Sequence, residues 1–466
     1  MNLSRIVERW AQQSPQRVAL RFQEREWTYA QFWQRIEQAT RSLGVGKGER
    51  VAWLGYNHPD MLALLFAAAR RGAILVPLNW RLAAAEHAAI LRDCAPRLLY
   101  CDAAFEPQAR QLGVPLGDWR DDGATHLAGR DEDDLLIVYT SGTTGTPKGA
   151  VLQQSALLWN GYNSIHAHDL RQDDHVLSAL PLFHVGGLNN QTLPALLAGA
   201  RITLHQRFEP GAWLQDVAAL RPTLSLLVPA TLAAVIGHPA WAGTDLSSLR
   251  LVNTGSMVVP EGLIHAFHAR GIPVGQIYGS TETAPIAIVL LRDDARRKPG
   301  SAGKPAMHCE VTLVEGEIWV RGPNVMRGYW NDPAATAAVL SADGWFRTGD
   351  LARVDDEGYY WILGRSRELI ISGGENVHPA ELENVLADCP QIAEAAVLGV
   401  EDTKWGEAAC AVVVRKPGAE LDEAAVLALF EDRLARFKHP RRIVFLDQLP
   451  RNALGKVQKS ELRKLL

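Results

Sequence analysis

The chain has 466 residues, 47% of them hydrophobic and 21% charged, with a formal net charge of −4. This length is too great for one ordinary domain and predicts about three folding units. The slightly acidic balance argues against general electrostatic attraction to nucleic acid, which usually requires a basic protein. The five cysteines are scattered and form no Cys-x-x-Cys pair, so we expect free thiols in a reducing compartment.

The N-terminal residues favour a cytoplasmic protein. Arg5, Glu8 and Arg9 interrupt the apolar stretch that a signal peptide requires. The most apolar stretch of the chain, residues 61–78, contains Arg70 and is therefore not expected to span a membrane.

Short apolar runs alternate with amphipathic segments through the first hundred residues. Strands are expected at 18–22, 25–28, 50–55, 73–77 and 98–101, with helices before Pro15, between Thr28 and Gly44, and at 60–69 and 83–92. Thr28 is expected to cap the second of these helices. Because strands that alternate with helices form βαβ units, this pattern predicts a parallel sheet covered by helices on both faces.

The alternation resumes further along the chain and then changes. Strands at 176–180, 201–204, 224–228, 251–252 and 274–277 indicate a second doubly wound unit. After Gly303 the strands become shorter, at 311–314, 316–320, 351–354 and 359–363, which predicts a small β-subdomain. The fold class is therefore predicted as α/β: a large N-terminal domain with two doubly wound subdomains and a β-subdomain, then a small α+β C-terminal domain.

One loop has the composition of a phosphate-binding site. It reads Tyr139-Thr140-Ser141-Gly142-Thr143-Thr144-Gly145-Thr146-Pro147-Lys148-Gly149 and follows an apolar strand. The glycines allow backbone N–H groups to surround an anion, the hydroxyls add donors, and the lysine adds a positive charge. The loop is not a Walker A motif, because glycine rather than serine or threonine follows the lysine. The alternative is a mobile loop between two strands.

A second group of polar residues follows a buried strand. Tyr278, Thr281 and Glu282 lie where open α/β sheets hold their ligands. An aromatic ring can stack on a base, a hydroxyl can bond a phosphate oxygen, and a carboxylate can hold Mg²⁺ through water. Considered alone, this stretch is equally consistent with an ordinary strand and loop.

Three further residues could carry chemistry. Asp350 could accept hydrogen bonds from both hydroxyls of a ribose, although an aspartate in a β-turn would look the same. Lys456 has basic neighbours and would ordinarily be a solvated surface lysine. His184 precedes paired glycines and could equally be a hydrogen-bonded structural histidine. No histidines have the spacing of a zinc site, and no G-x-S-x-G motif of an α/β-hydrolase occurs.

Taken together and in this order, the motifs resemble those of the adenylate-forming superfamily. This superfamily includes acyl-CoA synthetases, adenylation domains of peptide synthetases and luciferase. The resemblance rests on the phosphate-binding loop, Tyr278-Gly-Ser-Thr-Glu282, Thr348-Gly-Asp350, Gly364-Arg365 and Gly455-Lys456, and extends from Trp27 to Lys456. It implies an AMP-binding (adenylation) domain at residues 1–366 and a mobile C-terminal domain at 367–466.

The resemblance also implies a reaction in two steps. A carboxylate attacks the α-phosphate of ATP in the presence of Mg²⁺, which gives acyl-AMP and pyrophosphate. The thiol of CoA then displaces AMP. ATP supplies the activation, and the enzyme supplies position and charge neutralisation.

Roles for individual residues follow from the resemblance, position by position. The β- and γ-phosphates would be held by Thr140, Ser141, Gly142, Thr143, Thr144, Gly145 and Lys148. Adenine would lie beside Gly255, Ser256, Tyr278 and Gly279. Thr281 would lie near the α-phosphate, Glu282 would hold Mg²⁺, and the ribose would be bound by Asp350 and Arg365. Lys456 would bridge the substrate carboxylate and the α-phosphate, and His184 would line the acyl pocket. Arg367, at a position that is usually Asp or Lys in the family, would be the hinge, and the Ser372-Gly373-Gly374 loop would reach the thiol tunnel. The adenine-side loop, Thr254 to Met257, departs from the usual Gly-Gly-Ala-Pro pattern.

The substrate acid is expected to be aromatic, cinnamic or medium-chain, because the pocket-forming stretches are mostly small or apolar. A benzoyl-type acid with a second carboxylate is an alternative, since Arg207 could approach the site. The acyl group could also pass to a carrier-protein phosphopantetheine or an amine instead of CoA. A third alternative is a nucleotide-binding relative without catalytic activity. We expect a monomer or homodimer, with no nucleic-acid partner.

Overall fold

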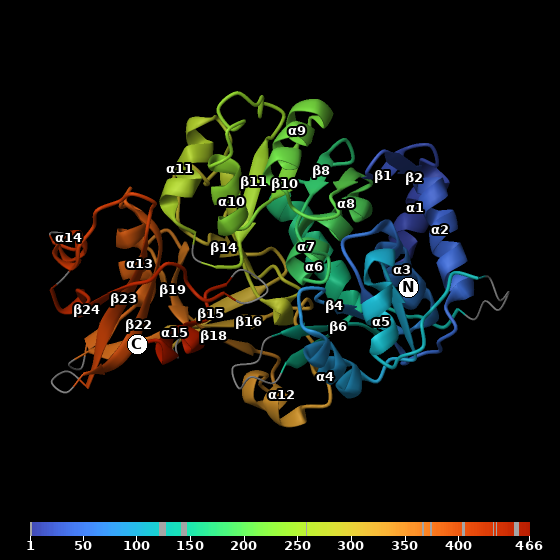
Figure 1. Ribbon diagram of the computed structural model, residues 1–466. Coiled ribbons are helices and arrows are strands. Elements are labelled where there is room, and N and C mark those ends of the chain that lie inside the picture. The colour runs from blue at the N-terminus through green and yellow to red at the C-terminus, as the bar shows by residue number, and fades with distance from the viewer. Residues whose placement is uncertain are drawn as a thin grey trace.

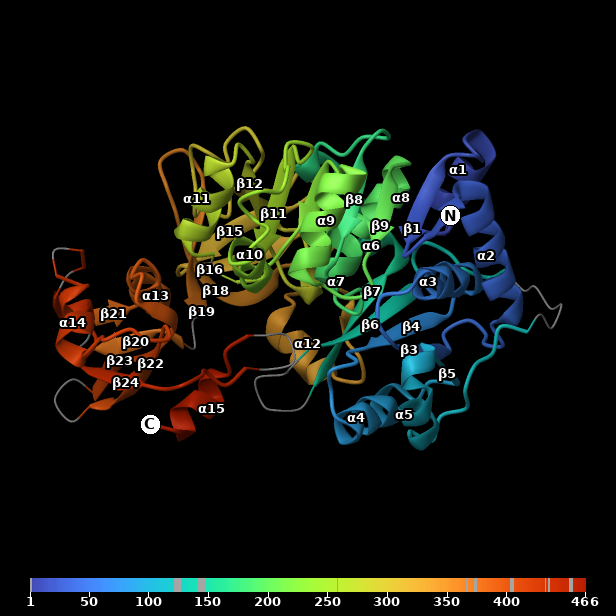
Figure 2. The ribbon, with the colours of Figure 1, turned by 45° about the horizontal axis from the view of Figure 1, so that its top comes forward.

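The computed structural model describes residues 2–120, 127–140, 147–257, 259–365, 368–372, 375–402, 406–431, 433–434, 436–451 and 456–466. Figure 1 and Figure 2 both show the C-terminal elements α13, α14 and β22–β24 at one end of the molecule and helices α1 and α2 at the other. Within the part of the chain that the structure describes, no helix is both long enough and apolar enough to cross a membrane.

The first sheet has six strands in the order β17-β7-β6-β4-β3-β5. Its strands are β3 (Arg50–Leu54), β4 (Ile74–Leu78), β5 (Leu98–Cys101), β6 (Asp134–Thr140), β7 (Lys148–Gln153) and β17 (Gly328–Tyr329). The pairs β3–β4, β3–β5 and β4–β6 are parallel, as the alternating pattern predicted. The strands that flank the predicted phosphate-binding loop, β6 and β7, pair antiparallel, and the distant strand β17 adds to β7.

The second sheet has nine strands in the order β14-β13-β12-β11-β10-β8-β9-β1-β2. Its strands are β1 (Val18–Phe22), β2 (Arg25–Thr28), β8 (His175–Ser178), β9 (Arg201–Leu204), β10 (Leu224–Leu226), β11 (Leu251–Gly255), β12 (Val274–Tyr278), β13 (Ile288–Val289) and β14 (Lys304–Pro305). The two strands expected at 18–22 and 25–28 pair antiparallel with each other, and β1 also pairs in parallel with β9, which places both strands in the second sheet. This position buries both Ala19 and Leu20 completely, one on each face of the strand.

Helices separate and cover the two sheets. They are α1 (Arg5–Gln13), α2 (Tyr29–Ser42), α3 (Pro59–Arg71), α4 (Ala84–Cys94), α5 (Glu106–Gln111), α6 (Gln154–His168), α7 (Val185–Gly187), α8 (Leu193–Ala198), α9 (Pro210–Leu220), α10 (Pro229–Ile236) and α11 (Glu261–Ala269). Apolar residues of α1, α2, α3, α6 and α8 form one core with residues from both sheets. Helices α4 and α5 cover the other face of the first sheet, and α9, α10 and α11 cover the other face of the second. Thr28 caps α2 as expected, accepting a hydrogen bond from the Gln31 backbone N–H.

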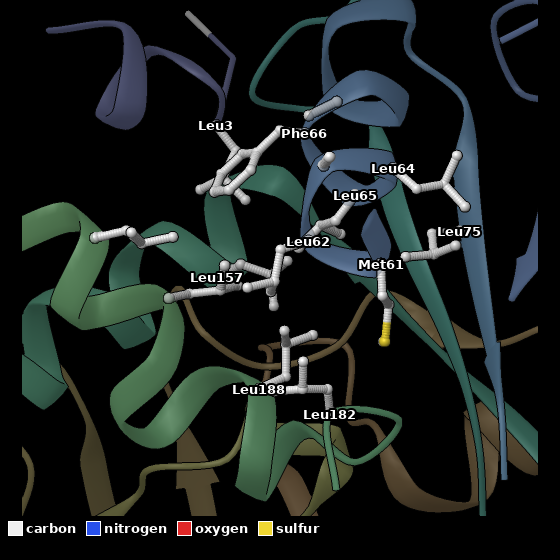
Figure 3. Close-up of a cluster of buried hydrophobic side chains, with 14 of the residues drawn as sticks. Leu3, Met61, Leu62, Leu64, Leu65, Phe66, Leu75, Leu157, Leu182 and Leu188 are labelled. Carbon is white, nitrogen blue, oxygen red and sulfur yellow. The ribbon is translucent and has the colours of Figure 1, made fainter. Parts of the chain in front are cut away.

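Helix α3 lies in the centre of this core. Its residues Met61 to Ala69 are all buried, so the helix is apolar on every side and packs like a core element. Figure 3 shows its leucine side chains beside Leu157 of α6, with Leu182 and Leu188 below them. The most apolar stretch of the sequence is therefore explained by burial between the two sheets.

The predicted β-subdomain is a four-stranded antiparallel sheet in the order β15-β16-β18-β19. Its strands are β15 (Glu310–Val314), β16 (Glu317–Arg321), β18 (Phe346–Val354) and β19 (Tyr360–Arg365), and α12 (Pro333–Val339) lies between β16 and β18 in the chain. Strand β18 begins at Phe346, five residues before the expected start at 351. Asp350 therefore lies inside a strand rather than in a turn.

The C-terminal part has its own sheet and its own core. The strands are β20 (Ile370–Ser372), β21 (Glu375–Val377), β22 (Ile392–Asp402), β23 (Gly406–Arg415) and β24 (Arg442–Phe445), and the helices are α13 (Pro379–Ala387), α14 (Glu423–Ala428) and α15 (Lys459–Lys464). Among the described residues, the two apolar clusters of this part contain only residues from 370 onward. The predicted boundary, with Arg367 as hinge, lies outside the described residues and stays a prediction.

Candidate functional site

Three polar residues meet where the second sheet adjoins the β-subdomain. The register of β18 and β19 places Asp350 directly opposite Arg365. The Arg365 Nε lies 2.6 Å from Asp350 Oδ1, and the Tyr278 hydroxyl donates a hydrogen bond of 2.7 Å to Asp350 Oδ2. Tyr278 is the last residue of β12, so two sheets contribute to one carboxylate. One oxygen of this aspartate is therefore held by a hydrogen bond and the other by an ion pair.

Burial dominates the electrostatics of this group. The pKa of the Asp350 carboxyl is raised by burial, while Arg365 and the Tyr278 hydrogen bond act in the opposite direction. Burial also raises the pKa of Tyr278, and the Asp350 charge adds to this increase. The tyrosine is therefore a hydrogen-bond donor throughout the physiological pH range, and the guanidinium compensates the aspartate charge.

Glu282 lies on the loop that follows β12. A short 3-10 helix, Thr281–Thr283, carries Glu282 together with Thr281. A Cβ atom at Gly279 would lie 1.7 Å from the Pro285 carbonyl oxygen, so this loop closes on itself only with glycine there. The Glu282 Oε1 accepts a 2.8 Å hydrogen bond from the Tyr329 hydroxyl. Sequence reasoning missed Tyr329, because β17 is too short to produce a strand signal.

The lysine of the phosphate-binding loop lies near this glutamate. Lys148 is the first residue of β7, opposite Thr140, the last residue of β6. Its Nζ lies 5.5 Å from the centre of the Tyr329 ring, and that tyrosine also bonds Glu282. The predicted phosphate-binding residues Ser141, Gly142, Thr143, Thr144 and Gly145 lie outside the described residues.

Lys456 reaches this site from the C-terminal part. It is half-buried, and burial together with the nearby Arg365 charge lowers its pKa. The carboxylates of Asp350, Glu368 and Glu282 act in the opposite direction. A lysine that feels these charges lies in the same electrostatic environment as Asp350 and Glu282. The structure thus brings together three motifs that are far apart in the sequence.

His184 lies beside Phe183, and the centres of the two rings are 4.4 Å apart. Its backbone precedes the short helix α7. Burial lowers the pKa of His184 to about 3, and the positive charges of Arg81 and Lys456 contribute. Its Nε2 atom is buried and has no hydrogen-bond partner among the described residues. A neutral imidazole with a free nitrogen therefore lies close enough to Lys456 to feel its charge.

The expected adenine-side residues lie at the end of β11, beside β12. A Cβ atom at Gly255 would lie 2.2 Å from the Ile277 carbonyl oxygen, so the close approach of the two strands requires glycine. Ser256 has a φ of 76°, in the left-handed region, and is exposed. The expected thiol-tunnel residues Gly373 and Gly374 lie outside the described residues, although the preceding Ser372 ends β20.

The donor set at this site fits magnesium better than zinc. No group of three or more histidine, cysteine, aspartate or glutamate side chains that could hold a metal occurs among the described residues. Magnesium is usually held by one or two carboxylates together with phosphate oxygens and water. The Glu282 carboxylate, already oriented by Tyr329, has the chemistry of such a ligand.

Comparison with known proteins agrees with this arrangement. Residues 7–330 match the family model of the AMP-binding enzyme, and residues 381–456 match that of the AMP-binding enzyme C-terminal domain. An indoleacetate–CoA ligase from Aromatoleum aromaticum is 50% identical over 100% of this chain and 98% of its own length. A feruloyl-CoA synthase from an Amycolatopsis species is 42% identical over 98% of this chain and 97% of its own.

A solved structure shares the whole architecture. The O-succinylbenzoate coenzyme A synthetase from Bacillus subtilis, in complex with ATP and a magnesium ion, superposes with a TM-score of 0.89 at 32% identity. The superposition covers 98% of this chain and 99% of that one. The predicted fold of a large N-terminal and a small C-terminal domain is thereby confirmed. The chain belongs to the family of AMP-binding enzymes, among the acid–CoA ligases of the adenylate-forming superfamily, as its sequence motifs predicted.

Proposed function

We propose that this chain is an AMP-forming acid–CoA ligase that activates an aromatic monocarboxylic acid. The observation that carries the proposal is the position of Lys456 beside Asp350, Arg365 and Glu282. A lysine that precedes the last helix, α15, has little reason to lie near a buried aspartate and a glutamate unless anionic ligands meet there. ATP and CoA are the cosubstrates. The relatives named indoleacetate–CoA ligase and feruloyl-CoA synthase carry names for the same class of reaction.

In the first step, the substrate carboxylate attacks the α-phosphorus of ATP and pyrophosphate leaves. Both reactants are anions, so their mutual repulsion opposes the approach. The Lys456 ammonium lies between them and neutralises part of this charge, which has its greatest effect in a site that excludes water. The backbone and hydroxyls of the loop from Thr140 to Lys148 hold the departing pyrophosphate.

The remaining nucleotide contacts come from the N-terminal domain. Asp350 and Arg365 hold the ribose hydroxyls, Tyr278 and Gly255 lie beside adenine, and Thr281 contacts the α-phosphate. Glu282 would hold Mg²⁺, which when bound supplies charge neutralisation to the phosphate oxygens. Because Asp350 is already held by Tyr278 on one oxygen and by Arg365 on the other, these groups bind the nucleotide with little reorganisation.

In the second step, the CoA sulfur attacks the acyl carbon of the acyl-AMP, the thiol loses its proton and AMP departs. The C-terminal domain turns about Arg367 between the two steps. This movement withdraws Lys456 and brings the loop at Ser372 to Gly374 to the thiol tunnel. The separate apolar cores on the two sides of this point support such a movement.

The acid is aromatic in this proposal. Two relatives over almost the full length are named for indoleacetate and ferulate, and both acids are aromatic monocarboxylates. The His184 imidazole packs against Phe183 and would line the acyl pocket, where it controls entry of the carboxylate or thiol. Arg207 is exposed and its guanidinium stacks on Tyr56 at 4.8 Å, which favours a monocarboxylic acid over a dicarboxylic one.

One screen tests the proposal. The enzyme is incubated with ATP, Mg²⁺ and CoA and with indole-3-acetate, ferulate, benzoate, o-succinylbenzoate or octanoate, and both pyrophosphate and thioester are measured. We expect the highest kcat/KM for indole-3-acetate or ferulate. Faster turnover of octanoate or o-succinylbenzoate would overturn the aromatic assignment but leave the ligase assignment intact. Failure to release pyrophosphate with every acid would instead favour a nucleotide-binding protein without catalytic activity.

The acceptor is tested separately. Replacement of CoA by a holo-carrier protein or a primary amine distinguishes CoA from the two other acceptors. Pyrophosphate release without CoA thioester, followed by acylation of the carrier or amine, would show that the acceptor assignment is wrong.

The free cysteines, four of them buried, support a reducing compartment such as the cytoplasm. Size-exclusion chromatography would determine whether the enzyme is a monomer or a homodimer.

A further inference from the structure

A segment outside the predicted motifs joins the two loops that would hold ATP. This segment, Asn324 to Trp330, follows β16 and includes β17; we name it the strap. It contacts the loop of Glu282 on one side and the strand of Lys148 on the other. The two loops are far apart in the sequence, and the strap hydrogen-bonds to both.

On the first side, the strap holds Glu282 by its backbone and by its side chain. The Met326 N–H donates a 2.7 Å hydrogen bond to the Glu282 carbonyl, and the Tyr329 hydroxyl donates one of 2.8 Å to Glu282 Oε1. One carboxylate oxygen is thereby restrained.

Asn324 secures the rest of the same loop. This asparagine is fully buried, and its Nδ2 donates to the carbonyl oxygens of Thr283 at 2.6 Å and Ile286 at 2.8 Å. Both donor hydrogens of the amide are therefore used on the backbone that carries Glu282. The Cys309 thiol contacts its Oδ1 at 3.2 Å, which fixes the amide orientation.

On the second side, the strap pairs with the strand of Lys148. Strand β17 is antiparallel to β7, with Tyr329 opposite Ala150. The backbone N–H of Trp330 donates a 2.7 Å hydrogen bond to the carbonyl of Gly149, the residue immediately after Lys148. The Tyr329 ring also lies beneath the Lys148 ammonium, at 5.5 Å.

We propose that Tyr329 and Asn324 are positioning residues that set the separation between Glu282 and Lys148. The inference rests on the proposed function, in which Glu282 holds Mg²⁺ and Lys148 holds the terminal phosphates of ATP. Those two groups must contact one Mg·ATP molecule at the same time, and catalytic groups need to be held to within about 0.5 Å. Tyr329 contacts both, so its hydroxyl and its ring restrain the two ends of the ligand together.

The decisive variant is Tyr329→Phe, which removes one hydroxyl and keeps the ring beneath Lys148. Loss of a hydrogen bond to a metal-binding carboxylate typically weakens metal affinity about 10-fold or more. We therefore expect the Mg²⁺ concentration for half-maximal adenylation to rise about 10-fold. A readout independent of turnover is the affinity of the ATP complex for Mn²⁺, measured by electron paramagnetic resonance, which should weaken to a similar extent.

The matched control is Tyr360→Phe. Tyr360 is buried, whereas Tyr329 is half-buried, and the Tyr360 hydroxyl donates a 3.1 Å hydrogen bond to the Val311 carbonyl inside the β-subdomain. This variant loses a comparable bond without touching Glu282, so its metal dependence should match the parent enzyme. Parental metal affinity in Tyr329→Phe would overturn the positioning role. A shift of the same size in Tyr360→Phe would also overturn it, because the cause would then be general destabilisation.

Two more variants separate this inference from the proposed function. Glu282→Gln should weaken metal binding strongly; if it does not, Glu282 is not the metal ligand and the proposed function fails at that point. If Glu282→Gln weakens binding but Tyr329→Phe does not, only the strap inference fails. Asn324→Asp places a carboxylate against two carbonyl oxygens, and we expect it to raise the metal requirement and lower the melting temperature together. An Asn324→Asp enzyme with parental metal dependence would remove Asn324 from the proposal.

Discussion

Two regions supply charged groups to the candidate site in different ways. Asp350 and Arg365 are opposite each other on paired strands, so the fold of the β-subdomain alone brings them together. Lys456 comes from the C-terminal part, whose apolar clusters contain only residues from 370 onward among the described residues. The first region belongs to one sheet, whereas the second comes from a part of the chain with its own apolar clusters. In the proposed mechanism, a site divided in this way binds nucleotide in both steps and loses Lys456 in the second.

The electrostatics agree with this division. Arg365 compensates the Asp350 charge through a direct contact of 2.6 Å. Lys456 is surrounded by charges of both signs, and burial together with Arg365 lowers its pKa. Its position therefore gains most when an anionic substrate adds negative charge beside it.

The largest expected effect is on the rate of adenylation, when the Lys456 ammonium is removed. Lys456→Ala should slow adenylation roughly 100- to 1,000-fold, because one preorganised charge at the reacting phosphate is lost. Thioester formation from supplied acyl-AMP should remain close to the parental rate, since the lysine is withdrawn during that step. Rapid-quench assays of the two half-reactions measure this contrast, and an equal loss in both would contradict the exchange of the lysine.

Removing the Asp350 carboxylate should weaken the binding of AMP instead. In the Asp350→Ala variant, AMP should bind roughly 10- to 100-fold more weakly, because hydrogen bonds to a charged group contribute about 1.5–3 kcal/mol. Lys456→Ala should leave AMP affinity unchanged. Isothermal titration calorimetry of both variants tests the division directly, and a reversed order of affinities would refute it.

Acid should destabilise the large N-terminal part. Burial lowers the pKa of His168 and of His175 to about 4 in the folded state, below the value of about 6.5 expected when unfolded. The unfolded chain therefore binds protons first, and stability is lost as the pH falls from 6.5 towards 4. The cost is about 2 kcal/mol per histidine at pH 5.

A pair of variants on helix α6 isolates this effect. His168→Gln should reduce the loss of stability between pH 7 and pH 5, whereas His166→Gln, at an exposed position of the same helix, should not. Urea denaturation at the two pH values measures the difference. Identical pH dependence in the two variants would show that His168 does not contribute.

The smallest effect is expected at an exposed lysine near the catalytic one. Lys464 pairs with Glu461 at 2.8 Å on α15, and its side chain is 69% exposed. Such surface pairs contribute about 0–1 kcal/mol, so Lys464→Ala should change neither stability nor adenylation appreciably. Measuring its melting temperature and pyrophosphate release beside Lys456→Ala checks that position, rather than charge on the C-terminal segment, is decisive. A large loss of activity in Lys464→Ala would contradict this.

Local pattern was sufficient for many of the site residues. Tyr278 and Glu282 lie at the end of a buried strand, and Asp350 and Arg365 belong to short motifs that the sequence shows individually. The contacts between these residues could not be predicted from those motifs. A turn was one alternative for Asp350, but it lies within β18, because β19 pairs with Asp350 and β16 pairs with Phe346 and Arg347 before the glycine.

Long-range pairing explains what the sequence could not predict. Strand β1 precedes the strands of the first sheet in the chain but pairs with β9 of the second, and the two-residue strand β17 pairs with β7. Strand partners depend on which apolar faces become covered after the chain collapses, and two residues carry no periodicity. Tyr329 was missed for this reason, although it contacts Glu282.

The sequence by itself determined the family, the α/β class and the set of chemical groups, because motifs and hydrophobic periodicity are local properties of the chain. Only the tertiary structure decided which groups come together: Tyr278 bonds Asp350, Tyr329 bonds Glu282, and Lys456 lies near enough to Asp350 and Glu282 to feel their charges. The physical reason is that each of these contacts joins segments held by different sheets or by different cores. Their distances are set by packing across the whole molecule, which no local pattern encodes.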